Sequence, residues 1–422
     1  MRLLYSLLMY AATPLVLAYF GLRGFRDRRY WRRWGERLGW GGAPARTGAI
    51  VVHAASMGEV NAASPLVGAL LDRPAPLPLL LTTFTPTGSR RARDLFGERI
   101  AHQYLPLDLP GAVRRFLDRQ QPALLIIMET EIWPNLIRAT TDRGIPVLLA
   151  NARMTERSMR GYRRLQPFIT PALGRVNRVL AQSAGDAERF VRCGARADRV
   201  SVGGNLKFDI DVPPSLTETG EMLKTSWGVT RPALVAGSTH AEDEDALFGA
   251  FRALLKTLPD ALLVLAPRHP ERFSGVAEDA RGAGFRACLR SARAVPPRDC
   301  QVMVLDTLGE LPRYYAAADL AFVGGTLSPV GGHNVLEPAA LGKPVLFGPH
   351  TANVRETSER LLETGAAQRV HDTEELRGAL EQLFRDAAAR DRMGQAGLKI
   401  VADGRGALEH ALGAVAELLP KA

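Results

Sequence analysis

Short apolar runs alternate with amphipathic stretches along the chain after Gly41-Gly42. Near-continuous apolar runs separated by helix-like segments are typical of parallel strands buried on both faces. In the first half they predict strands at Ala49–Ala55, Leu77–Phe84, Ala101–Leu107, Ala123–Met128, Ile145–Ala150 and Arg178–Gln182. The first half therefore reads as one doubly wound α/β domain.

A second series of the same kind follows a polar segment, Asp211–Gly220, whose two prolines suggest a linker. The expected strands are Ala233–Ala236, Ala261–Ala266, Gln301–Leu305, Leu320–Val323 and Pro344–Phe347, and the expected helices are Asp243–Thr257, Glu271–Ala283, Glu310–Ala317, Asn334–Leu341 and a terminal group from Asp372. We therefore expect two Rossmann-like α/β domains, 41–210 and 221–422, that face a central cleft.

The amino terminus is the one long apolar stretch. Leu3–Phe20 carries no charged residue and reaches the lower edge of the length that spans a bilayer, and Pro14 is tolerated in membrane helices. Arginines and aromatic residues follow it at once. We call these arginines the basic collar: Arg23, Arg26, Arg28, Arg29, Arg32, Arg33 and Arg37.

A secretory signal peptide carries its positive charge before the apolar run, whereas here Arg2 alone precedes it. We therefore predict an uncleaved anchor over residues 1–40, spanning the membrane or lying in its surface, with the downstream domains in the cytoplasm. The collar suits anionic phosphates. The alternative is a buried core helix followed by a solvated basic stretch.

Composition adds only broad limits. The net charge is +10, which suits polyanions such as nucleic acid, anionic lipid or a phosphorylated substrate without choosing among them. The three cysteines are odd in number and lack C-x-x-C spacing, so neither a disulfide framework nor a zinc site is expected.

Carboxylates appear where two strands of the first half end. Glu59, in HAASMGE, lies three residues after Ser56, so it is either half of a capping box or a general base at the carboxyl end of the first strand. Glu129 and Glu131, in METEIWPN, either complement a helix dipole or bind acceptor hydroxyls and orient arginines such as Arg153. Lys207, in GNLKFD, is one of only six lysines and could meet a carboxylate or phosphate.

The second half carries residues suited to an anion. Ser238 follows the first strand in a glycine-hydroxyl turn, which is a weak motif for an anion site. Arg268 and His269, in APRHP, could bind one phosphate, although a lone arginine is more often a surface ion-pair partner.

The stretch Gly324-Gly325-Thr326 to Pro338 is the richest in candidate chemistry. Gly332 and its neighbour would let the backbone approach a ligand, a helix beginning near Asn334 would offer N–H groups to phosphate, and Glu337 could accept hydrogen bonds from ribose. The simpler alternative is a tight turn capped by Asn334.

Taken together, HAASMGE, METEIWPN, GNLKFD, APRHP, LGEL (308–311) and GGHNVLEP occur in an order and spacing that resembles the bacterial 3-deoxy-D-manno-octulosonic acid (Kdo) transferases, over nearly the whole chain. The resemblance implies the GT-B architecture and an inverting, metal-independent transfer of Kdo from CMP-Kdo to a lipid A precursor at the bacterial inner membrane. It implies no cofactor and no nucleic-acid partner, and it leaves the oligomeric state open.

The resemblance also implies roles for single residues. Glu59 would be the catalytic base, and Ser56, Glu129 and Glu131 would form the acceptor side. Ser238, Arg268, His269 and Asn334 would hold the CMP phosphate, with Gly332 beside them, and Glu337 would contact the ribose. The backbone of Gly309, Glu310 and Leu311 would face the cytosine, and Lys207 would meet the Kdo carboxylate.

Two other functions are compatible with parts of the pattern. A nucleotide-sugar 2-epimerase shares the double-Rossmann architecture, but the apolar amino terminus argues against a soluble enzyme. A membrane-tethered binding protein would use the basic collar without catalysis, and would leave the carboxylates at the strand ends without a role.

Overall fold

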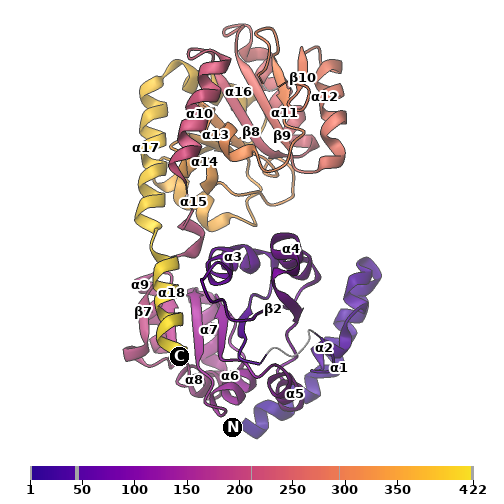
Figure 1. Ribbon diagram of the computed structural model, residues 1–422, viewed down its shortest axis with the longest axis vertical. Coiled ribbons are helices and arrows are strands. Elements are labelled where there is room, and N and C mark those ends of the chain that lie inside the picture. The colour runs from indigo at the N-terminus through magenta and orange to yellow at the C-terminus, as the bar shows by residue number, and fades with distance from the viewer. Residues whose placement is uncertain (1, 43–46, 211, 294, 420–422) are drawn as a thin grey trace. The chain divides into compact units, whose positions relative to one another are not determined.

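The computed structural model describes residues 2–42, 47–210, 212–293 and 295–419. The chain forms two compact units, one comprising Met1–Asp209 with Gly404–Ala422 and the other Ile210–Asp403 (Figure 1). Each unit is built on one seven-stranded sheet in which every paired strand is parallel. The predicted α/β class with two Rossmann-like sheets is confirmed.

Unit 1 has the strand order β3-β2-β1-β4-β5-β6-β7. Its strands are β1 Ile50–His53, β2 Leu79–Thr83, β3 Ala101–Tyr104, β4 Leu124–Met128, β5 Val147–Ala152, β6 Arg178–Ala181 and β7 Val200–Val202. Its helices are α1 Arg2–Arg26, α2 Trp34–Arg37, α3 Met57–Leu71, α4 Pro86–Phe96, α5 Pro110–Gln120, α6 Pro134–Thr141, α7 Glu156–Arg164, α8 Gln166–Leu173, α9 Ala184–Arg192 and α18 Ala407–Leu418.

Unit 2 has the strand order β10-β11-β9-β8-β12-β13-β14. Its strands are β8 Ala233–Thr239, β9 Leu262–Pro267, β10 Ala287–Leu289, β11 Val302–Val304, β12 Leu320–Val323, β13 Val345–Phe347 and β14 Ala367–Arg369. Its helices are α10 Pro214–Trp227, α11 Ala241–Leu254, α12 Phe273–Gly282, α13 Leu311–Ala317, α14 Leu336–Ala340, α15 Arg355–Glu363, α16 Thr373–Arg385 and α17 Ala387–Gly404.

The apolar strands are buried on both faces because successive side chains point to opposite sides of each sheet. In β1, Val51 packs into one hydrophobic cluster while Ile50 and Val52 pack into another. In β8, Leu234 and Val235 divide in the same way between two clusters of unit 2. This double burial explains why the strands read as continuous apolar runs.

The predicted linker is in large part a helix. Residue 211 lies outside the described residues, and α10 begins at Pro214 with Pro213 as its N-cap. Proline is favoured in the first helical turn, where its missing N–H would have had no partner. The two prolines therefore mark a helix start where we had expected an irregular segment.

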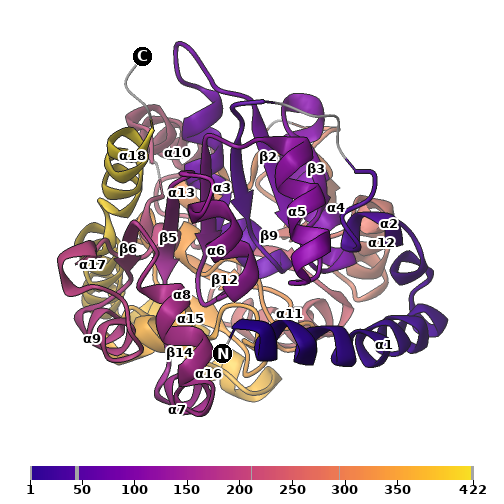
Figure 2. The same cartoon turned by 90° about the horizontal axis from the view of Figure 1, so that it is seen from below.

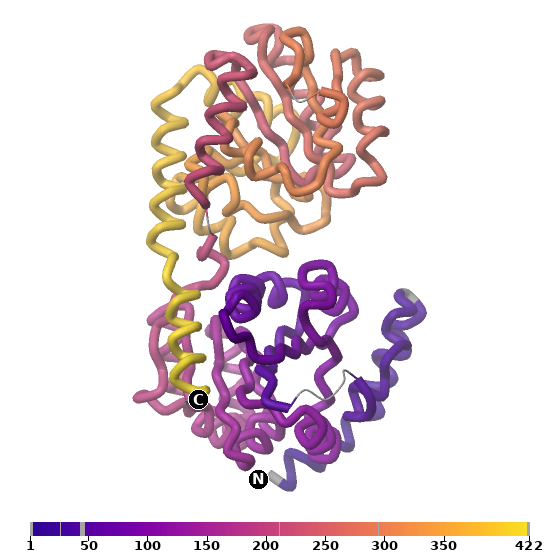
Figure 3. The backbone as a smooth tube through the Cα atoms, in the orientation of Figure 1, coloured from indigo at the N-terminus to yellow at the C-terminus, as the bar shows by residue number. Residues whose placement is uncertain are grey.

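The carboxyl terminus also differs from the expected domain 221–422. The chain passes from unit 1 to unit 2 after Asp209 and returns near Gly404 (Figure 3), and α18 packs on α3, β5 and β6 of unit 1. The carboxylate of Asp209 accepts hydrogen bonds from the backbone N–H groups of Gly406, at 2.8 Å, and Leu408, at 2.7 Å. It thereby fixes the start of α18 on unit 1, a tertiary contact that a local pattern does not show.

The amino-terminal helix is part of unit 1, so residues 1–40 do not form a domain of their own. Figure 2 shows α1 running along the outside of this unit. Its stretch Leu3–Phe25 is long and apolar enough to cross a membrane, judged by length and composition alone, and 11% of the most apolar window is buried. Tyr5, Ser6, Val16 and Phe20 are on the inward side, whereas the outward side exposes Leu3, Leu7, Leu15, Leu22 and Phe25.

The basic collar is divided in the structure. Arg37 is 1% exposed, with its guanidinium over the rings of Phe20, Phe84 and Tyr104. Arg33 is half-buried and pairs with Glu36 at 2.6 Å. The side chains of these two arginines make their contacts within unit 1. The expectation that they meet anionic phosphates is therefore wrong. Arg23, Arg28, Arg29 and Arg32 are exposed, and the side chain of Arg26 lies outside the described part.

Candidate active site

The candidate acidic residues of unit 1 lie at the switch point of its sheet. β1 is the first strand, and the chain proceeds outward through β2 and β3 before it returns to add β4 on the other side of β1. Ligands of doubly wound sheets bind outside the carboxyl ends of the strands at such a point. Glu59 follows β1, and Glu129 and Glu131 follow β4, so the topology brings the predicted base and the predicted acceptor pair together.

Glu59 is folded back over the start of its own helix. Its backbone N–H donates to Ser56 Oγ at 3.3 Å, and its carboxylate accepts from the Ala55 N–H at 2.7 Å and from Ser56 Oγ at 3.2 Å. This is close to a capping box, with Ala55 N–H in place of the N-cap N–H. The capping interpretation is therefore confirmed in its main features, and it places Ser56 in contact with the proposed base.

The surroundings of Glu59 favour its protonated form. Burial, followed by the negative charges of Glu131 and then Glu129, raises the pKa of Glu59 to about 8. The hydrogen bonds from Ala55 and Ser56 oppose this shift without cancelling it. A carboxyl group with a pKa near neutrality can take and hold a proton at working pH, which is what a general base requires.

The loop that carries the acceptor pair, residues 129–133, is called here the acidic loop. It begins with Glu129 in the left-handed region, at φ +55°, a conformation that is strained for a residue with a side chain. Thr130 fastens the loop at two points, because its Oγ1 donates to the Arg153 carbonyl at 2.8 Å and its own carbonyl accepts from Tyr162 Oη at 2.9 Å.

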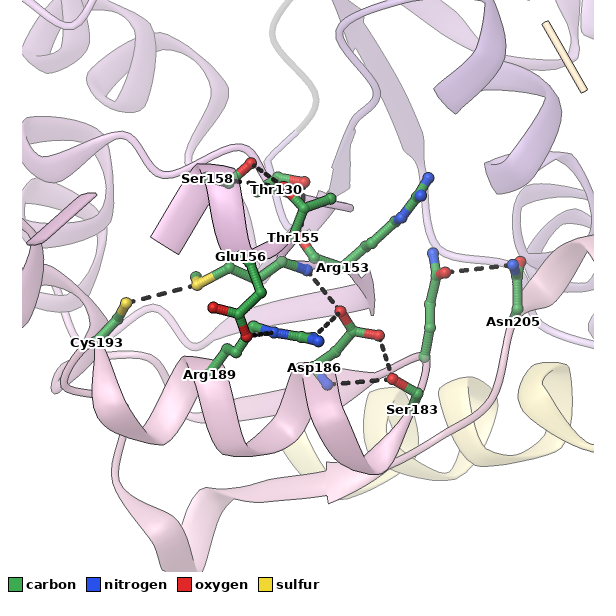
Figure 4. A network of polar contacts seen from close by, with 12 residues as sticks. Thr130, Arg153, Thr155, Glu156, Ser158, Ser183, Asp186, Arg189, Cys193 and Asn205 are labelled. Atoms are coloured by element: carbon green, nitrogen blue, oxygen red, sulfur yellow. Dashed lines mark hydrogen bonds and ion pairs between the residues drawn. The ribbon is translucent and has the colours of Figure 1, made fainter. Parts of the chain in front are cut away.

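Figure 4 shows the polar network beneath that attachment. Asp186 Oδ1 accepts from the Met154 N–H at 2.9 Å and from Arg189 at 3.2 Å, while Ser183 bonds the other carboxylate oxygen. The network holds the segment after β5, on which Thr130 rests. The side chain of Arg153 extends away from Asp186 in this view.

Lys207 lies in unit 1, where its ammonium is 3.6 Å from Glu129 Oε1. Its loop is fixed by Asn205, which accepts from the Lys207 N–H at 3.0 Å, and by Asn151, which accepts from the Leu206 N–H at 3.0 Å. The structure thus brings Lys207 to the acidic group of unit 1, and its predicted role as a donor ligand remains a prediction.

His53 supports the acidic loop through Trp133, the last residue of that loop, and neither residue was assigned a role from the sequence. His53 is fully buried at the end of β1, with Nδ1 3.1 Å from Thr82 Oγ1 and Nε2 3.9 Å from Glu131 Oε2. Trp133 meets the His53 ring edge-on, with centroids 6.2 Å apart. A histidine in an otherwise apolar strand was the one signal in the sequence that could have drawn attention to this contact.

Unit 2 has its own switch point, between β8 and β12. Ser238 lies near the end of β8 with φ +56°, again a left-handed conformation for a residue with a side chain. Gly324 follows β12 directly, and a Cβ there would lie 2.6 Å from the carbonyl oxygen of Ser238. Glycine is therefore required at 324 because the backbone segments that contain Gly324 and Ser238 are in direct contact.

Asp243 organises the glycine loop, by which we mean residues 324–332. Its buried carboxylate accepts from the N–H groups of Gly325, at 2.7 Å, and Leu327, at 2.9 Å, and more weakly from Thr326 at 3.3 Å. It also accepts from the His240 N–H at 2.9 Å. One carboxylate thus ties the loop after β12 to the start of α11, a role that the sequence did not reveal.

Histidines line the same edge of unit 2. The rings of His240 and His333 are nearly parallel, and their Nε2 atoms are 3.1 Å apart, so one ring donates while the other accepts. His269 meets His240 edge-on with centroids 5.4 Å apart, and burial lowers the pKa of His240. The turn at residues 237–240, the APRHP motif and the GGHNVLEP motif therefore come together at this edge.

Arg268 is exposed after β9, and within the described residues its guanidinium has no acidic partner. This observation removes the surface ion-pair alternative for the described part of the chain. His269, by contrast, is 3.7 Å from Glu271. A free guanidinium at the ligand-binding edge of a sheet is available for an anion.

The segment Gly309–Leu311 follows β11. Gly309 has φ +81° and open space around it, whereas Leu311 packs near Gly237. Glu310 is taken up by Arg290, Arg313 and Thr307, all of which contact its carboxylate. These contacts hold the loop in its conformation. The side chain of Glu310 is thus engaged within the loop, and the backbone of Gly309 remains open.

The GGHNVLEP stretch gives a mixed result. Gly332 has φ +83°, and a Cβ there would lie 2.9 Å from Val354, so this glycine lets the loop pack against the segment that contains Val354. Asn334 accepts from the Leu336 N–H at 3.1 Å and donates to Glu337 at 3.1 Å, as the capped-turn alternative predicted. The helix that follows, Leu336–Ala340, begins two residues after Asn334, and phosphate binding at its N-terminus remains a prediction.

Among the described residues, no three His, Cys, Asp or Glu side chains are grouped so that they could hold a metal ion. The expected metal independence of the reaction remains a prediction.

Comparison with known proteins places the chain in a clear context. The family model for "3-Deoxy-D-manno-octulosonic-acid transferase (kdotransferase)" matches residues 32–210. The 3-deoxy-D-manno-octulosonic acid transferase of Haemophilus influenzae is 39% identical over 97% of this chain and 97% of its own. That of Bordetella pertussis is also 39% identical, over 99% of each chain.

Solved structures resemble the chain more distantly. The UDP-GlcNAc 2-epimerase from Neisseria meningitidis bound to UDP-GlcNAc is 14% identical, with a TM-score of 0.52, over 88% of this chain and 99% of its own. This likeness reflects a shared fold.

Proposed function

We propose that this chain, which belongs to the 3-deoxy-D-manno-octulosonic acid transferase family and is a GT-B glycosyltransferase, transfers Kdo from CMP-Kdo to a lipid A precursor such as lipid IVA, with inversion and without a metal. The observation that carries the proposal is the cluster of Glu59, Glu129 and Glu131 at the switch point of unit 1, in which the pKa of Glu59 is raised to about 8.

In this proposal Glu59 acts as the general base. Its carboxylate takes the proton from a hydroxyl of the acceptor, and the hydroxyl oxygen forms a bond to the anomeric carbon of Kdo. The bond from that carbon to the phosphate oxygen breaks, and CMP leaves with the electron pair. Attack opposite the departing CMP inverts the anomeric centre. Glu129 and Glu131 hold acceptor hydroxyls, and Lys207, 3.6 Å from Glu129, supplies positive charge for the Kdo carboxylate.

Unit 2 supplies the nucleotide site. Ser238, Arg268, His269 and Asn334 are proposed for the phosphate, the open backbone at Gly309 for the cytosine, and Glu337 for the ribose. The exposed guanidinium of Arg268 and the loop fixed by Asp243 support this assignment. Charge that develops on leaving CMP can be stabilised by preorganised donors, so no metal is required.

The amino terminus gives a proposed location, the cytoplasmic face of the bacterial inner membrane. The outward side of α1 exposes Leu3, Leu15 and Phe25, while its inward side packs on unit 1 with Phe20 3% exposed. A helix held along a domain in this way suits the plane of the membrane surface rather than a crossing. The exposed arginines of the collar would meet anionic lipid phosphates.

The test is a transfer reaction with purified protein, CMP-Kdo and tetraacylated lipid A precursor in EDTA, read by product mass. A gain of one or more Kdo masses with release of CMP is expected. Activity only after a divalent metal is restored would contradict metal independence, and no product from folded protein would contradict the donor and acceptor. Product from UDP-GlcNAc alone would instead revive the epimerase alternative, for which the shared fold is the only support.

A further inference from the structure

The inward side of α1 is bound to unit 1 by specific polar contacts near its start. Tyr5 Oη donates to Asp108 Oδ2 at 2.9 Å, and Ser6 Oγ donates to Asn135 Oδ1 at 3.2 Å. Asp108 is 1% exposed and also accepts from the N–H groups of Asn135, at 2.9 Å, and Leu136, at 2.7 Å. One buried carboxylate therefore joins α1 to the first turn of α6, directly after the acidic loop.

A second connection runs through aromatic rings near the other end of α1. We call Phe20, Phe84, Trp133 and His53 the aromatic column. Successive centroids are 5.8 Å apart for Phe20 and Phe84, 5.6 Å for Phe84 and Trp133, and 6.2 Å for Trp133 and His53. The column ends where His53 Nε2 lies 3.9 Å from Glu131 Oε2.

Both connections reach the acidic loop. Asp108 fixes the residues that directly follow the acidic loop. Trp133, a member of the aromatic column, is the last residue of the acidic loop. We propose that α1 is a positioning element of the acceptor site, in which Tyr5 and Phe20 hold the acidic loop in place, in addition to any role of the helix at a membrane. The proposal rests on the proposed function, because it takes the acidic loop to be the acceptor side.

A membrane anchor alone does not require these contacts. The outward side of α1 would serve an anchor, and a flexible tether would do so equally well. A buried carboxylate shared between a helix and the N-terminus of α6 costs free energy unless every contact is made, so it specifies one arrangement. Reaction rates are sensitive to misplacement of a catalytic group by as little as about 1 Å.

The test uses full-length protein in detergent micelles that also contain the acceptor, so that membrane partition does not limit the rate. Tyr5→Phe and Phe20→Leu are the test variants. Tyr19→Phe and Phe25→Leu make the same chemical changes at exposed positions of α1, 52% and 77% exposed, and serve as matched controls. Glu59→Gln reports whether the proposed site is the active one.

The expected result is a fall in kcat/KM for the acceptor of about 10-fold in both test variants and no change in the controls. The donor KM should stay constant. Loosening the acidic loop moves Glu131 and Glu129 away from Glu59, so the acid limb of the pH profile should shift to lower pH. A merely less stable protein would lose active molecules without moving that limb.

Test variants that match their controls in rate and in pH profile overturn the proposal and leave α1 as an anchor. Tyr5→Phe removes a single oxygen, so it decides the matter even where Phe20→Leu does not fold. If Glu59→Gln keeps full activity, the proposed active site fails, and the positioning proposal fails with it. Loss of activity in Glu59→Gln with unaltered Tyr5→Phe and Phe20→Leu refutes the positioning role alone.

Discussion

The backbone N–H of Ala55 donates a hydrogen bond to the Oε2 atom of Glu59 at a distance of 2.7 Å. This bond makes Glu59 part of a helix cap, while burial and, after it, the nearby charges of Glu131 and Glu129 raise its pKa. The two interpretations of Glu59, a cap and a base, are therefore compatible. The cap holds in place a carboxyl group whose proton affinity is raised by burial and by its acidic neighbours.

The pH dependence of transfer follows from this arrangement. A base must be deprotonated to act, and the pKa of Glu59 is about 8, so kcat/KM should fall as pH decreases through about 8. Glu131→Gln removes the largest repelling charge and should lower that pKa, which moves the acid limb to lower pH. Glu98→Gln, at an exposed position outside the site, is the control. If the acid limb of the pH profile stays at the same pH in Glu131→Gln, the carboxylate of Glu131 does not raise the pKa of Glu59.

Arg268→Ala should weaken donor binding without affecting folding, because the side chain is exposed and has no acidic partner among the described residues. Loss of a charge-assisted contact to phosphate corresponds to about 1.5–3 kcal/mol, or a rise of about 10-fold to 100-fold in the Kd for CMP. Calorimetric titration with CMP measures it, with exposed Arg281→Ala as the matched control. Equal affinities in the two variants would remove Arg268 from the donor site.

Asp243→Asn should damage both stability and donor binding. The buried carboxylate accepts four backbone N–H bonds, from His240, Gly325, Thr326 and Leu327, and an amide would turn a donor toward some of them. We expect a loss of about 2–3 kcal/mol in the free energy of unfolding, measured by denaturant titration, and weaker CMP binding in the protein that remains folded. Exposed Asp245→Asn should have neither effect. If Asp243→Asn binds CMP with the wild-type affinity, the glycine loop has no part in nucleotide binding.

Leu15→Gln tests the proposed membrane surface. This side chain is 74% exposed on the outward side of α1, and losing its insertion should cost about 1.5–3 kcal/mol, equivalent to about 10-fold to 100-fold weaker binding to vesicles of anionic lipid. Sedimentation with the vesicles measures the binding, and Val229→Gln, at a position 66% exposed in unit 2, is the control. Equal partition of the two variants would place the membrane contact elsewhere.

The sequence predicted the parts of the fold that local pattern controls. The strands buried on both faces, such as β4 and β9, were found from their apolar runs. The edge strands β7, β10 and β14 were missed. They are as short as the inner strands β11 and β13, but their residues are mostly exposed or half-buried, so they form no apolar run. The return of α18 to unit 1 depends on the carboxylate of Asp209 meeting N–H groups almost two hundred residues away, which no window of sequence contains.

The candidate site residues Glu59, Glu129 and Ser238 were chosen because each lies at or shortly after the carboxyl end of an apolar strand. The residues that hold these in place were missed, because their partners are distant in sequence: His53 with Glu131, and Asp243 with Gly325. Arg37 was misinterpreted for a related reason. Its position in an arginine-rich stretch suggested a surface, and only the fold brings Phe20, Phe84 and Tyr104 around it.

The most direct test of the central claim is single-turnover transfer with saturating CMP-Kdo and lipid A precursor in EDTA, comparing wild type with Glu59→Gln at equal CMP affinity. General base catalysis contributes about 10²-fold to 10⁴-fold, so the account predicts that the chemical rate falls by at least about 100-fold in Glu59→Gln while CMP still binds. A rate within about threefold of wild type would contradict Glu59 as the base and, with it, the catalytic role assigned to the acidic cluster.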